Sequence, residues 1–323
     1  MKIITGIQSS GKLHIGNYFG AIKPILEYQE QNNELFTFIA DYHALTTSAD
    51  PATTKQNTID AVVDYLSLGI DPHKTTFFLQ SDVPSLMELY FILSKFTPMG
   101  LLQRSHSYKD KIDKGLTPNH ALFSYPVLMA ADILMFDIDI VPVGKDQMQH
   151  LEIAQEIARK FNNEYGEVFT IPKMIVNEET AIVPGINGDK MSKSYGNTID
   201  IFQSEKSLKK VCSKIITDST ELGSPIDYKN SNLYKLSALF LNENERIDLQ
   251  KRYLSGNEGY GHFKMYLKDL IYSYYSDSMA RREHYLNNMD EVYTILDIGA
   301  EKANSIAFNK MKEVRKAIGL GIR

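Results

Sequence analysis

Two polar segments of the chain carry residues suited to binding phosphate. In the first, His14, Gly16 and Asn17 follow a short apolar run and a Gly/Ser turn, a pattern that predicts a strand, a tight loop and a helix. The unsatisfied N–H groups and positive dipole end of such a helix favour an anion. Gly16, which has no Cβ, would let adenine and its ribose approach the backbone closely. Taken alone, this segment is explained equally well by a helix cap with an incidental histidine.

The second segment lies at residues 185–197, where glycines flank two lysines and two serines. The glycines predict a mobile loop, and the side chains of Lys190, Ser192, Lys193 and Ser194 offer several donors to a polyphosphate. A basic surface turn is the simpler alternative. The other predicted phosphate-binding segment upstream, at residues 14–17, favours the polyphosphate interpretation.

The turn after the first strand also comes close to a P-loop. Gly6, Gly11 and Lys12 have the spacing of that motif, which ends in a Ser or Thr hydroxyl that holds magnesium. Leu13 stands at that last position and has no oxygen to offer a metal. A P-loop kinase or NTPase is therefore the less favoured alternative.

A buried carboxylate is predicted in the apolar stretch 125–134. If the helix begins at Val127, with Pro126 in its first turn, then Met129 and Asp132 are three residues apart and share one face. Burial of a carboxylate is costly unless a donor faces it. Asp132 therefore has either a structural partner or a ligand.

The elements that must position these groups form an α/β fold. Apolar runs at 3–7, 35–40, 75–79 and 138–143 predict buried strands, and helical periodicity between them implies a parallel sheet. Ligands gather at the carboxyl ends of such strands, which would bring residues 41–43 and 144–147 to one crevice. There His43 is either a ligand contact or a structural histidine, and Asp146 either accepts from ribose hydroxyls or caps a helix.

The remainder of the chain divides into an excursion and a helical region. Around residues 99–118 basic residues replace the apolar periodicity, which indicates an excursion from the sheet. Beyond residue 200 the pattern is helical. The aromatics at helical spacing between 263 and 274 are expected in the core rather than in base stacking.

Composition limits the class of protein. The 323 residues are 43% hydrophobic and 23% charged, as in globular proteins, and no membrane-spanning or targeting segment is visible. Cys212 is the single cysteine, which excludes an internal disulfide and a cysteine-based zinc site. We predict no metal site built by protein ligands, and a cytoplasmic protein.

The pair formed by residues 14–17 and 190–194, in this order and spacing, resembles the paired signatures of the class I aminoacyl-tRNA synthetases. Asn17 stands where most of the class has histidine, a variant familiar among the bacterial tryptophanyl-tRNA synthetases. Further stretches resemble that family in particular: 11–22, 41–44, 125–132, 141–147 and 299–303. Tyrosyl-tRNA synthetases are the nearest rival, but they typically carry glutamine where this chain has Met129. A carboxylate with a thioether suits an indole, which has only an N–H donor, better than a phenol.

The resemblance implies activation of L-tryptophan by ATP, accompanied by Mg²⁺, and transfer to tRNA(Trp). Site roles carried over from the family fall into three groups. The catalytic residues would be His14, Asn17, Lys111, Lys190 and Lys193. ATP would be bound by Gln8, Ser9, Ser10, Gly16, Asn17, Gly144, Lys145, Asp146, Ile182, Lys190, Met191, Ser192, Lys193 and Ser194, and tryptophan by His43, Tyr125, Met129, Asp132 and Gln147. Two departures from the family pattern, Lys145 in place of glutamate and the run 181–186, put contacts to ATP in doubt.

The family also implies the domain organisation and the partners. A Rossmann-like catalytic domain would span 1–195, with the connective excursion at about 99–120, and a helical anticodon-binding domain would span 196–299. The last helix, 300–323, would pack back on the catalytic domain. The family is a homodimer in which tRNA spans both subunits. A catalytically inactive paralogue that only binds RNA is the alternative of a different class, and the lysines of the predicted mobile loop argue against it.

Overall fold

A five-stranded parallel sheet forms the centre of the fold. The structure is a computed structural model that describes all residues except 10, 32, 47–49, 105–117, 177–182 and 322–323. The strands are β1 (Lys2–Ile7), β2 (Glu34–Ile39), β3 (Thr75–Leu79), β4 (Ile140–Val143) and β5 (Lys173–Val176), in the order β3-β2-β1-β4-β5. The order reverses between β1 and β4, so the carboxyl ends of these two strands flank the crevice where ligands of such sheets bind.

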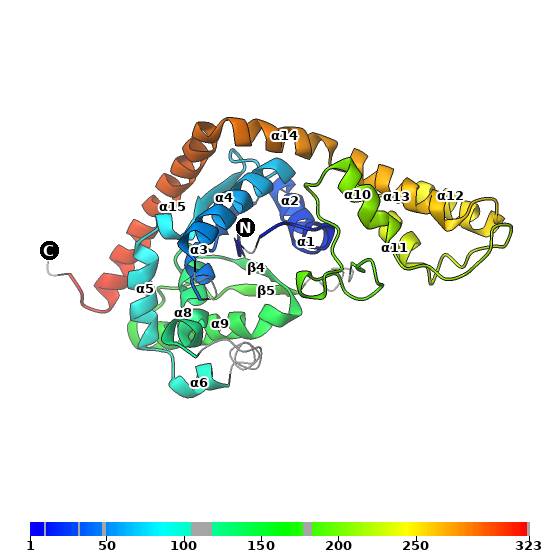
Figure 1. Cartoon of the computed structure of the whole chain (residues 1–323). Coiled ribbons are helices and arrows are strands. Elements are labelled where there is room, and N and C mark those ends of the chain that lie inside the picture. Colours follow the sequence, from blue (N-terminus) through cyan, green and yellow to red (C-terminus); the bar gives the residue numbers. More distant parts are fainter. Residues whose placement is uncertain (10, 32, 47–49, 105–117, 177–182, 322–323) are drawn as a thin grey trace.

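Helices cover both faces of the sheet (Figure 1). The chain continues through α1 (Ile15–Asn17), the π-helix η1 (Tyr18–Ile22), α2 (Lys23–Glu30), α3 (Asp41–Ala44), α4 (Pro51–Leu68), η2 (Gln80–Asp82), α5 (Ser85–Ser94), α6 (Met99–Gln103), α8 (His120–Leu134), η3 (Lys145–Gln147) and α9 (Met148–Tyr165). Successive side chains of a strand point to opposite faces. Thus Ile3 and Leu35 pack with α2 and α4, whereas Ile4 and Phe36 pack with α5, α8 and α9.

The helical region follows the short helix η4 (Lys193–Tyr195). It consists of α10 (Glu205–Ser213), α11 (Asn232–Ala238), α12 (Glu243–Ser255), α13 (Tyr260–Tyr274) and α14 (Ser276–Asn287). In α13, Phe263, Leu267 and Ile271 are fully buried, as the spacing predicted. The expectation that the aromatics lie in the core is confirmed for Phe263, whereas Tyr266 is half-buried and Tyr274 is 40% exposed. The α/β fold with a helical C-terminal region, predicted from the pattern of the sequence, is therefore confirmed.

One long helix, α15 (Met289–Ala317), returns from the helical region to the sheet. It packs along β3 and α5. The close approach requires Gly299, because a Cβ there would lie 1.8 Å from the carbonyl oxygen of Phe77. Farther along, the buried Lys310 donates to the carbonyl oxygen of Val168 (3.0 Å) and pairs with Asp137 (2.7 Å).

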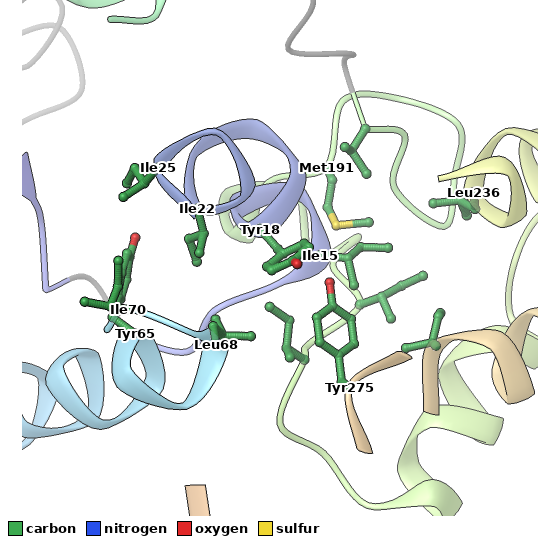
Figure 2. Close-up of a cluster of buried hydrophobic side chains, with 14 of the residues drawn as sticks. Ile15, Tyr18, Ile22, Ile25, Tyr65, Leu68, Ile70, Met191, Leu236 and Tyr275 are labelled. Atoms are coloured by element: carbon green, nitrogen blue, oxygen red, sulfur yellow. The ribbon is translucent and has the colours of Figure 1, made fainter. Parts of the chain in front are cut away.

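The core of the first sheet face continues into the helical region. Figure 2 shows Ile15 of the first phosphate segment and Tyr18, which follows that segment, near Met191 of the second segment and Tyr275 at the end of α13. Tyr18 contacts Tyr275 edge to face, with ring centroids 5.2 Å apart, and its hydroxyl lies 3.1 Å from that of Tyr274. The phosphate segments are thus packed directly against the helical region.

The prediction that α8 begins at Val127 is wrong. The helix begins at His120, where the side chain of Asn119 accepts from the N–H of Leu122 at 2.8 Å and caps the first turn. Pro126 lies inside the helix. Its missing N–H costs one helical hydrogen bond, and the apolar packing of Leu122, Val127 and their neighbours keeps the helix intact.

Candidate functional site

The first phosphate segment is a reciprocal helix cap. The N–H of Asn17 donates to Nδ1 of His14 (3.3 Å), and Oδ1 of Asn17 accepts from the N–H of His14 (3.1 Å). Because Nδ1 of His14 accepts, the proton of the neutral ring lies on Nε2, which can then donate to a ligand. Gly16 is required beside this cap, since a Cβ there would lie 2.9 Å from Nδ1 of His14.

The imidazole of His14 is neutral near pH 7. The pKa of His14 is lowered to about 4, chiefly by burial and in part by the ammonium of Lys193, while the carboxylate of Asp200 opposes the shift. A neutral donor stabilises developing negative charge on phosphate oxygen by a hydrogen bond, without a net charge of its own. The positive charge of the site therefore comes from the lysines of the second segment.

The second phosphate segment is joined to the first by backbone hydrogen bonds. The N–H of Ile15 donates to the carbonyl of Ile199 (3.0 Å), and the N–H of Ile201 donates to that of Leu13 (3.0 Å). The chain directly after residues 185–197, which we call the lysine loop, therefore lies against the helix that carries His14. Met191 of the loop itself lies 3.4 Å from where a Cβ on Gly16 would be. The two segments predicted from the sequence as phosphate devices lie together in the structure.

Asn197, for which the sequence predicts no role, holds the lysine loop. Its buried carboxamide accepts from the N–H of Ser192 (2.8 Å) and donates to the carbonyl of Lys190 (3.1 Å) and to the side chain of Asn187 (2.8 Å). Gly185 lies against it, where a Cβ would be 2.3 Å from Nδ2 of Asn197. A carboxamide with both its donors and its acceptor used inside one loop fixes the path of that loop.

We predict that Asn197→Ala impairs adenylate formation more than it impairs tryptophan binding. Loss of the carboxamide leaves backbone groups of residues 190 and 192 unpaired, at about 1 to 3 kcal/mol each, and frees the loop. The rate of adenylate formation should fall by about tenfold or more, measured in single turnover. Asn187→Ala is the matched control, since it removes only one of the three bonds; an equal loss in both variants would contradict this role.

Further residues that the resemblance assigns to ATP binding lie at the crevice between the carboxyl ends of β1 and β4, where the strand order reverses. After β1, Gln8 is exposed and Ser9 is buried, and the hydroxyl of Ser9 has no hydrogen-bond partner among the described residues. After β4, Gly144 and Lys145 are exposed at the start of η3. An unpaired buried hydroxyl beside exposed backbone at a switch point is suited to a nucleotide.

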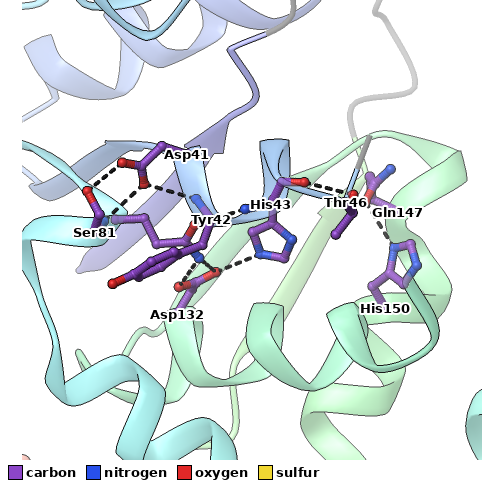
Figure 3. A network of polar contacts seen from close by, with 9 residues as sticks. Asp41, Tyr42, His43, Thr46, Ser81, Asp132, Gln147 and His150 are labelled. Atoms are coloured by element: carbon purple, nitrogen blue, oxygen red, sulfur yellow. Dashed lines mark hydrogen bonds and ion pairs between the residues drawn. The ribbon is translucent and has the colours of Figure 1, made fainter. Parts of the chain in front are cut away.

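Asp132 is buried and accepts from two side chains (Figure 3). Nε2 of Gln80 lies 2.8 and 2.9 Å from its two oxygens, and Nε2 of His43 lies 3.1 Å from Oδ2. Burial raises the pKa of Asp132 above its ordinary value, and the two donors oppose that shift. His43 thus lies beside Asp132, the residue with which the family resemblance grouped it.

Sequence reasoning missed Gln80. Gln80 follows β3 directly, and its Oε1 accepts from the N–H of His43 (3.4 Å). It therefore contacts both the carboxylate of Asp132 and the other residue that holds this carboxylate, His43. The signal that could have found it is the same one that pointed to residues 41–43: a polar residue at the carboxyl end of a buried parallel strand.

We predict that tryptophan affinity weakens with acid at a higher pH than an ordinary aspartate would give. The raised pKa of Asp132 means that its carboxylate takes up a proton earlier as pH falls. The protonated form would lose the charge-assisted bond to the indole N–H that the family resemblance implies. The dissociation constant of tryptophan, measured by calorimetry across pH 4 to 8, should rise on the acid side, and the rise should disappear in Asp132→Asn.

A second group of hydrogen-bonded polar side chains lies near Asp132 and its two donors. The hydroxyl of Tyr125 lies 2.7 Å from Nε2 of His150, and Nδ1 of His150 lies 3.0 Å from Oε1 of Gln147. The structure therefore brings together Tyr125 and Gln147, both predicted to bind the amino acid, through a buried histidine that the prediction omitted. Met129, one helical turn before Asp132, is half-buried.

Some predicted residues cannot be placed. Ser10, Lys111 and Ile182 lie outside the described residues, as does Lys109 of the excursion. Asp146 lies in η3, but its side chain is outside the described part. Among the described residues, no group of three or more His, Cys, Asp or Glu side chains could hold a metal ion, and every helix is too short or too polar to cross a membrane.

Comparison with known proteins identifies the family. The family model of class I tRNA synthetases (W and Y) matches residues 1–280. A tryptophan–tRNA ligase of Campylobacter jejuni is 58% identical over 320 residues, which cover 99% of this chain and 100% of the relative. One from Fusobacterium nucleatum is 50% identical over 99% of this chain and 98% of the relative.

The solved structures agree. A crystal structure of tryptophanyl-tRNA synthetase from Campylobacter jejuni, complexed with ADP and tryptophan, superimposes with a TM-score of 0.95 at 57% identity and covers 99% of this chain and 100% of that one. The chain belongs to the tryptophanyl-tRNA synthetase family. The enzyme from Mycoplasma pneumoniae is also similar, with 30% identity, a TM-score of 0.83, and coverage of 99% and 98%.

Membership of the tryptophanyl-tRNA synthetase family confirms the resemblance predicted from residues 14–17 and 190–194. It decides against the tyrosyl rival, of which an archaeal structure is only 18% identical, a likeness that concerns the fold alone. The P-loop alternative also fails, because Leu13 is packed against the apolar core and offers no metal ligand.

Proposed function

We propose that this synthetase activates L-tryptophan with ATP to tryptophanyl-adenylate and transfers the tryptophanyl group to tRNA(Trp), releasing pyrophosphate and AMP. The observation that carries the proposal is 58% identity along the whole length of a tryptophan–tRNA ligase. The site supports it independently, with two phosphate-binding segments packed together and a buried carboxylate held by two donors at the same edge of the sheet.

The first step is attack of the tryptophan carboxylate on the α-phosphorus of ATP, with pyrophosphate as the leaving group. The protein positions the two substrates and stabilises charge that develops on the phosphates. His14 donates from Nε2, Gly16 and Asn17 receive the nucleotide at the helix start, and Lys190 and Lys193 approach the leaving pyrophosphate with the hydroxyls of Ser192 and Ser194. Gln8, Ser9, Gly144 and the backbone around 145–146 hold the ribose and adenine side.

Tryptophan is bound at the carboxyl ends of β2 and β3. Asp132 accepts the indole N–H, Met129 lines the pocket, and Tyr125 with Gln147 meets the amino group. His43, together with Gln80, holds the Asp132 carboxylate in place. Lys111, Ser10 and Ile182 keep the ATP roles that the family pattern gives them.

Magnesium is proposed to enter with ATP. The donors of the lysine loop are cations and hydroxyls, which suit phosphate oxygens rather than a bare divalent ion. The ion would therefore be held by the phosphates, where it supplies charge neutralisation for the leaving pyrophosphate.

The domain division stays a proposal. We assign catalysis to residues 1–195 and recognition of the tRNA anticodon to the helical region 196–299, with 300–323 returning to the catalytic part. Packing of α15 along β3 supports the last of these assignments. A cytoplasmic location fits translation and remains part of this proposal.

We propose further that the enzyme is a homodimer. On α5, the side chains of Met87 and Phe91 are four residues apart on one face and are 39% and 78% exposed, and Met99 follows at 62%. A cluster of large apolar side chains in water indicates a surface that another protein covers, and the family implies a second copy of this chain.

Phe91→Asp should convert the dimer to monomers. The carboxylate places charge in the centre of the covered surface, where it would be desolvated without a partner. Analytical ultracentrifugation at micromolar concentration should show the mass halved. Leu222→Asp, at a side chain that is 71% exposed in the helical region, is the control; a monomeric unmodified protein, or a dimer that survives Phe91→Asp, would refute the assignment.

The experiment that tests the function is exchange of pyrophosphate into ATP, with L-tryptophan and L-tyrosine in parallel and without tRNA. Exchange with tryptophan alone supports the proposal together with the role of Asp132. Exchange with tyrosine keeps the class and overturns the pocket assignment. No exchange from folded protein with magnesium present favours the RNA-binding paralogue.

A further inference from the structure

One well-formed cavity among the described residues lies outside the site described so far. Its volume is about 790 Å³, within the range of pockets that bind small molecules. Its walls are the end of β3, helix α3, the first half of α4 and the beginning of α15. Apolar side chains make up most of the lining, including Val62, Leu79 and Leu296.

The charged side chains of the cavity are mostly acidic. Among the described lining residues, Asp41, Asp50, Asp82 and Asp297 carry carboxylates and Lys55 carries the single ammonium. Burial, and the neighbouring carboxylates of Asp41 and Asp297, raise the pKa of Asp82. A cation in the cavity would relieve this repulsion, and an anion would increase it.

The mouth of the cavity is apolar and exposed. Leu45 on one side is 61% exposed and Tyr293 on the other is 48% exposed. Large apolar side chains at the rim of a cavity favour a ligand with an apolar body. Together with the carboxylates, they indicate a ligand that combines an apolar part with one positive charge.

The cavity shares a wall with the tryptophan site. In α3, Asp41 and Tyr42 line the cavity, while the next residue, His43, contacts Asp132. In η2, Ser81 and Asp82 line the cavity, while Gln80, the residue before them, contacts Asp132. Figure 3 shows this wall, in which Asp41 accepts from the N–H of Ser81 (3.0 Å) and from its hydroxyl (2.5 Å).

We propose that this cavity is a second binding site, for a small amphipathic cation, and that its occupancy changes the affinity of the enzyme for tryptophan. A ligand packed against Tyr42 and Leu79 contacts α3 and η2 on the side away from Asp132. It would therefore restrict the movement of the two donors to Asp132, His43 and Gln80. It should therefore strengthen tryptophan binding. The coupling part of this inference rests on the proposed function, whereas binding of the cation does not.

The test uses three probes with one apolar body: 4-phenylbutylamine, 4-phenylbutanol and 4-phenylbutyrate. Binding to the full-length enzyme is followed by ligand-observed NMR in the presence of saturating tryptophan, so that the amino-acid site is blocked. The amine should bind and the carboxylate should not, with the alcohol at least about tenfold weaker than the amine. Equal binding of all three would overturn the assignment of a cation site, as would no binding of the amine at millimolar concentration.

Variants then locate the site. Thr58→Trp fills the cavity from α4, and Asp297→Asn removes one of its carboxylates; both should weaken binding of the amine by about tenfold or more. Asp290→Asn, on the exposed first turn of the same helix α15 and outside the lining, is the matched control. Unchanged binding in Thr58→Trp would place the amine elsewhere and refute the proposal.

Coupling is measured as a reciprocal pair of affinities. Calorimetry should show that 4-phenylbutylamine tightens tryptophan binding by about fivefold or more, and tryptophan should tighten amine binding by the same factor. A factor of one in both directions would refute the coupling. Because neither measurement uses ATP turnover, failure of this inference is distinguishable from failure of the proposed catalytic function.

Discussion

Asp132→Asn should lose about 10²- to 10⁴-fold in kcat/KM for tryptophan in the pyrophosphate exchange reaction. The asparagine keeps the shape of the carboxylate but replaces one acceptor oxygen by a donor N–H₂ group. Gln80 donates to both oxygens of Asp132 and His43 contacts one of them, so the new donor must face another donor. The charge-assisted bond to the indole is lost as well.

The matched control for this variant is Asp248→Asn, at an aspartate whose side chain is 70% exposed. It should leave the exchange rate unchanged. Thermal melting of both variants separates a folding defect from a binding defect, since an unfolded Asp132→Asn protein would lose ATP binding too. Normal exchange in a folded Asp132→Asn enzyme would remove this residue from tryptophan recognition.

A tryptophan analogue without the indole N–H tests the proposed contact with Asp132 by changing the ligand instead of the protein. L-3-benzothienylalanine has sulfur in place of the indole N–H and a similar shape. The unmodified enzyme should discriminate against it by roughly 10⁴-fold, because the buried carboxylate would be left without its ligand donor. In Asp132→Asn that discrimination should shrink, since the contact that carries it is already gone.

The sequence predicted those parts of the site that rest on local pattern. Residues 14–17 and 190–194 stand out by residue type and spacing, and the strands β2 and β4, which precede His43 and Gly144, are visible as apolar runs. Gln80 and Asn197 were missed for a physical reason. Each acts through hydrogen bonds to residues brought near by the fold, Asp132 in one case and the backbone of 190–192 in the other. The position of Gln80 directly after a predicted strand was a usable signal, but it does not show which group the side chain meets, and Asn197 in its loop has no distinguishing local pattern.

The start of α8 was predicted wrongly because a local residue preference was given too much weight. Proline is favoured in the first turn of a helix, which placed the helix start near Pro126. The cap at Asn119 and the buried side chains on both sides of Pro126 outweigh the lost hydrogen bond. Tertiary packing of an apolar helix, rather than propensity at one position, set its length.

Lys193→Ala should slow adenylate formation by about 10²- to 10³-fold, the loss typical of one group that stabilises transition-state charge. Burial lowers the pKa of Lys193, and the carboxylates of Asp200 and Asp64 oppose that shift and keep the ammonium favourable. With His14 neutral, this ammonium is one of the positive charges available to the leaving pyrophosphate. The affinity for tryptophan should change little, because Asp132 and its two donors are untouched.

The two half-reactions distinguish this role from a general structural one. Pyrophosphate has already left when tryptophan is transferred from a preformed adenylate to tRNA, so that step has no use for a charge placed on pyrophosphate. Single-turnover transfer by Lys193→Ala should therefore stay within a few-fold of the unmodified enzyme, while single-turnover adenylate formation collapses. Lys206→Ala, on the exposed surface of α10, should leave both rates unchanged. Equal losses in both half-reactions would mean that Lys193 holds the fold of the loop, and that the charge on the leaving group is met elsewhere.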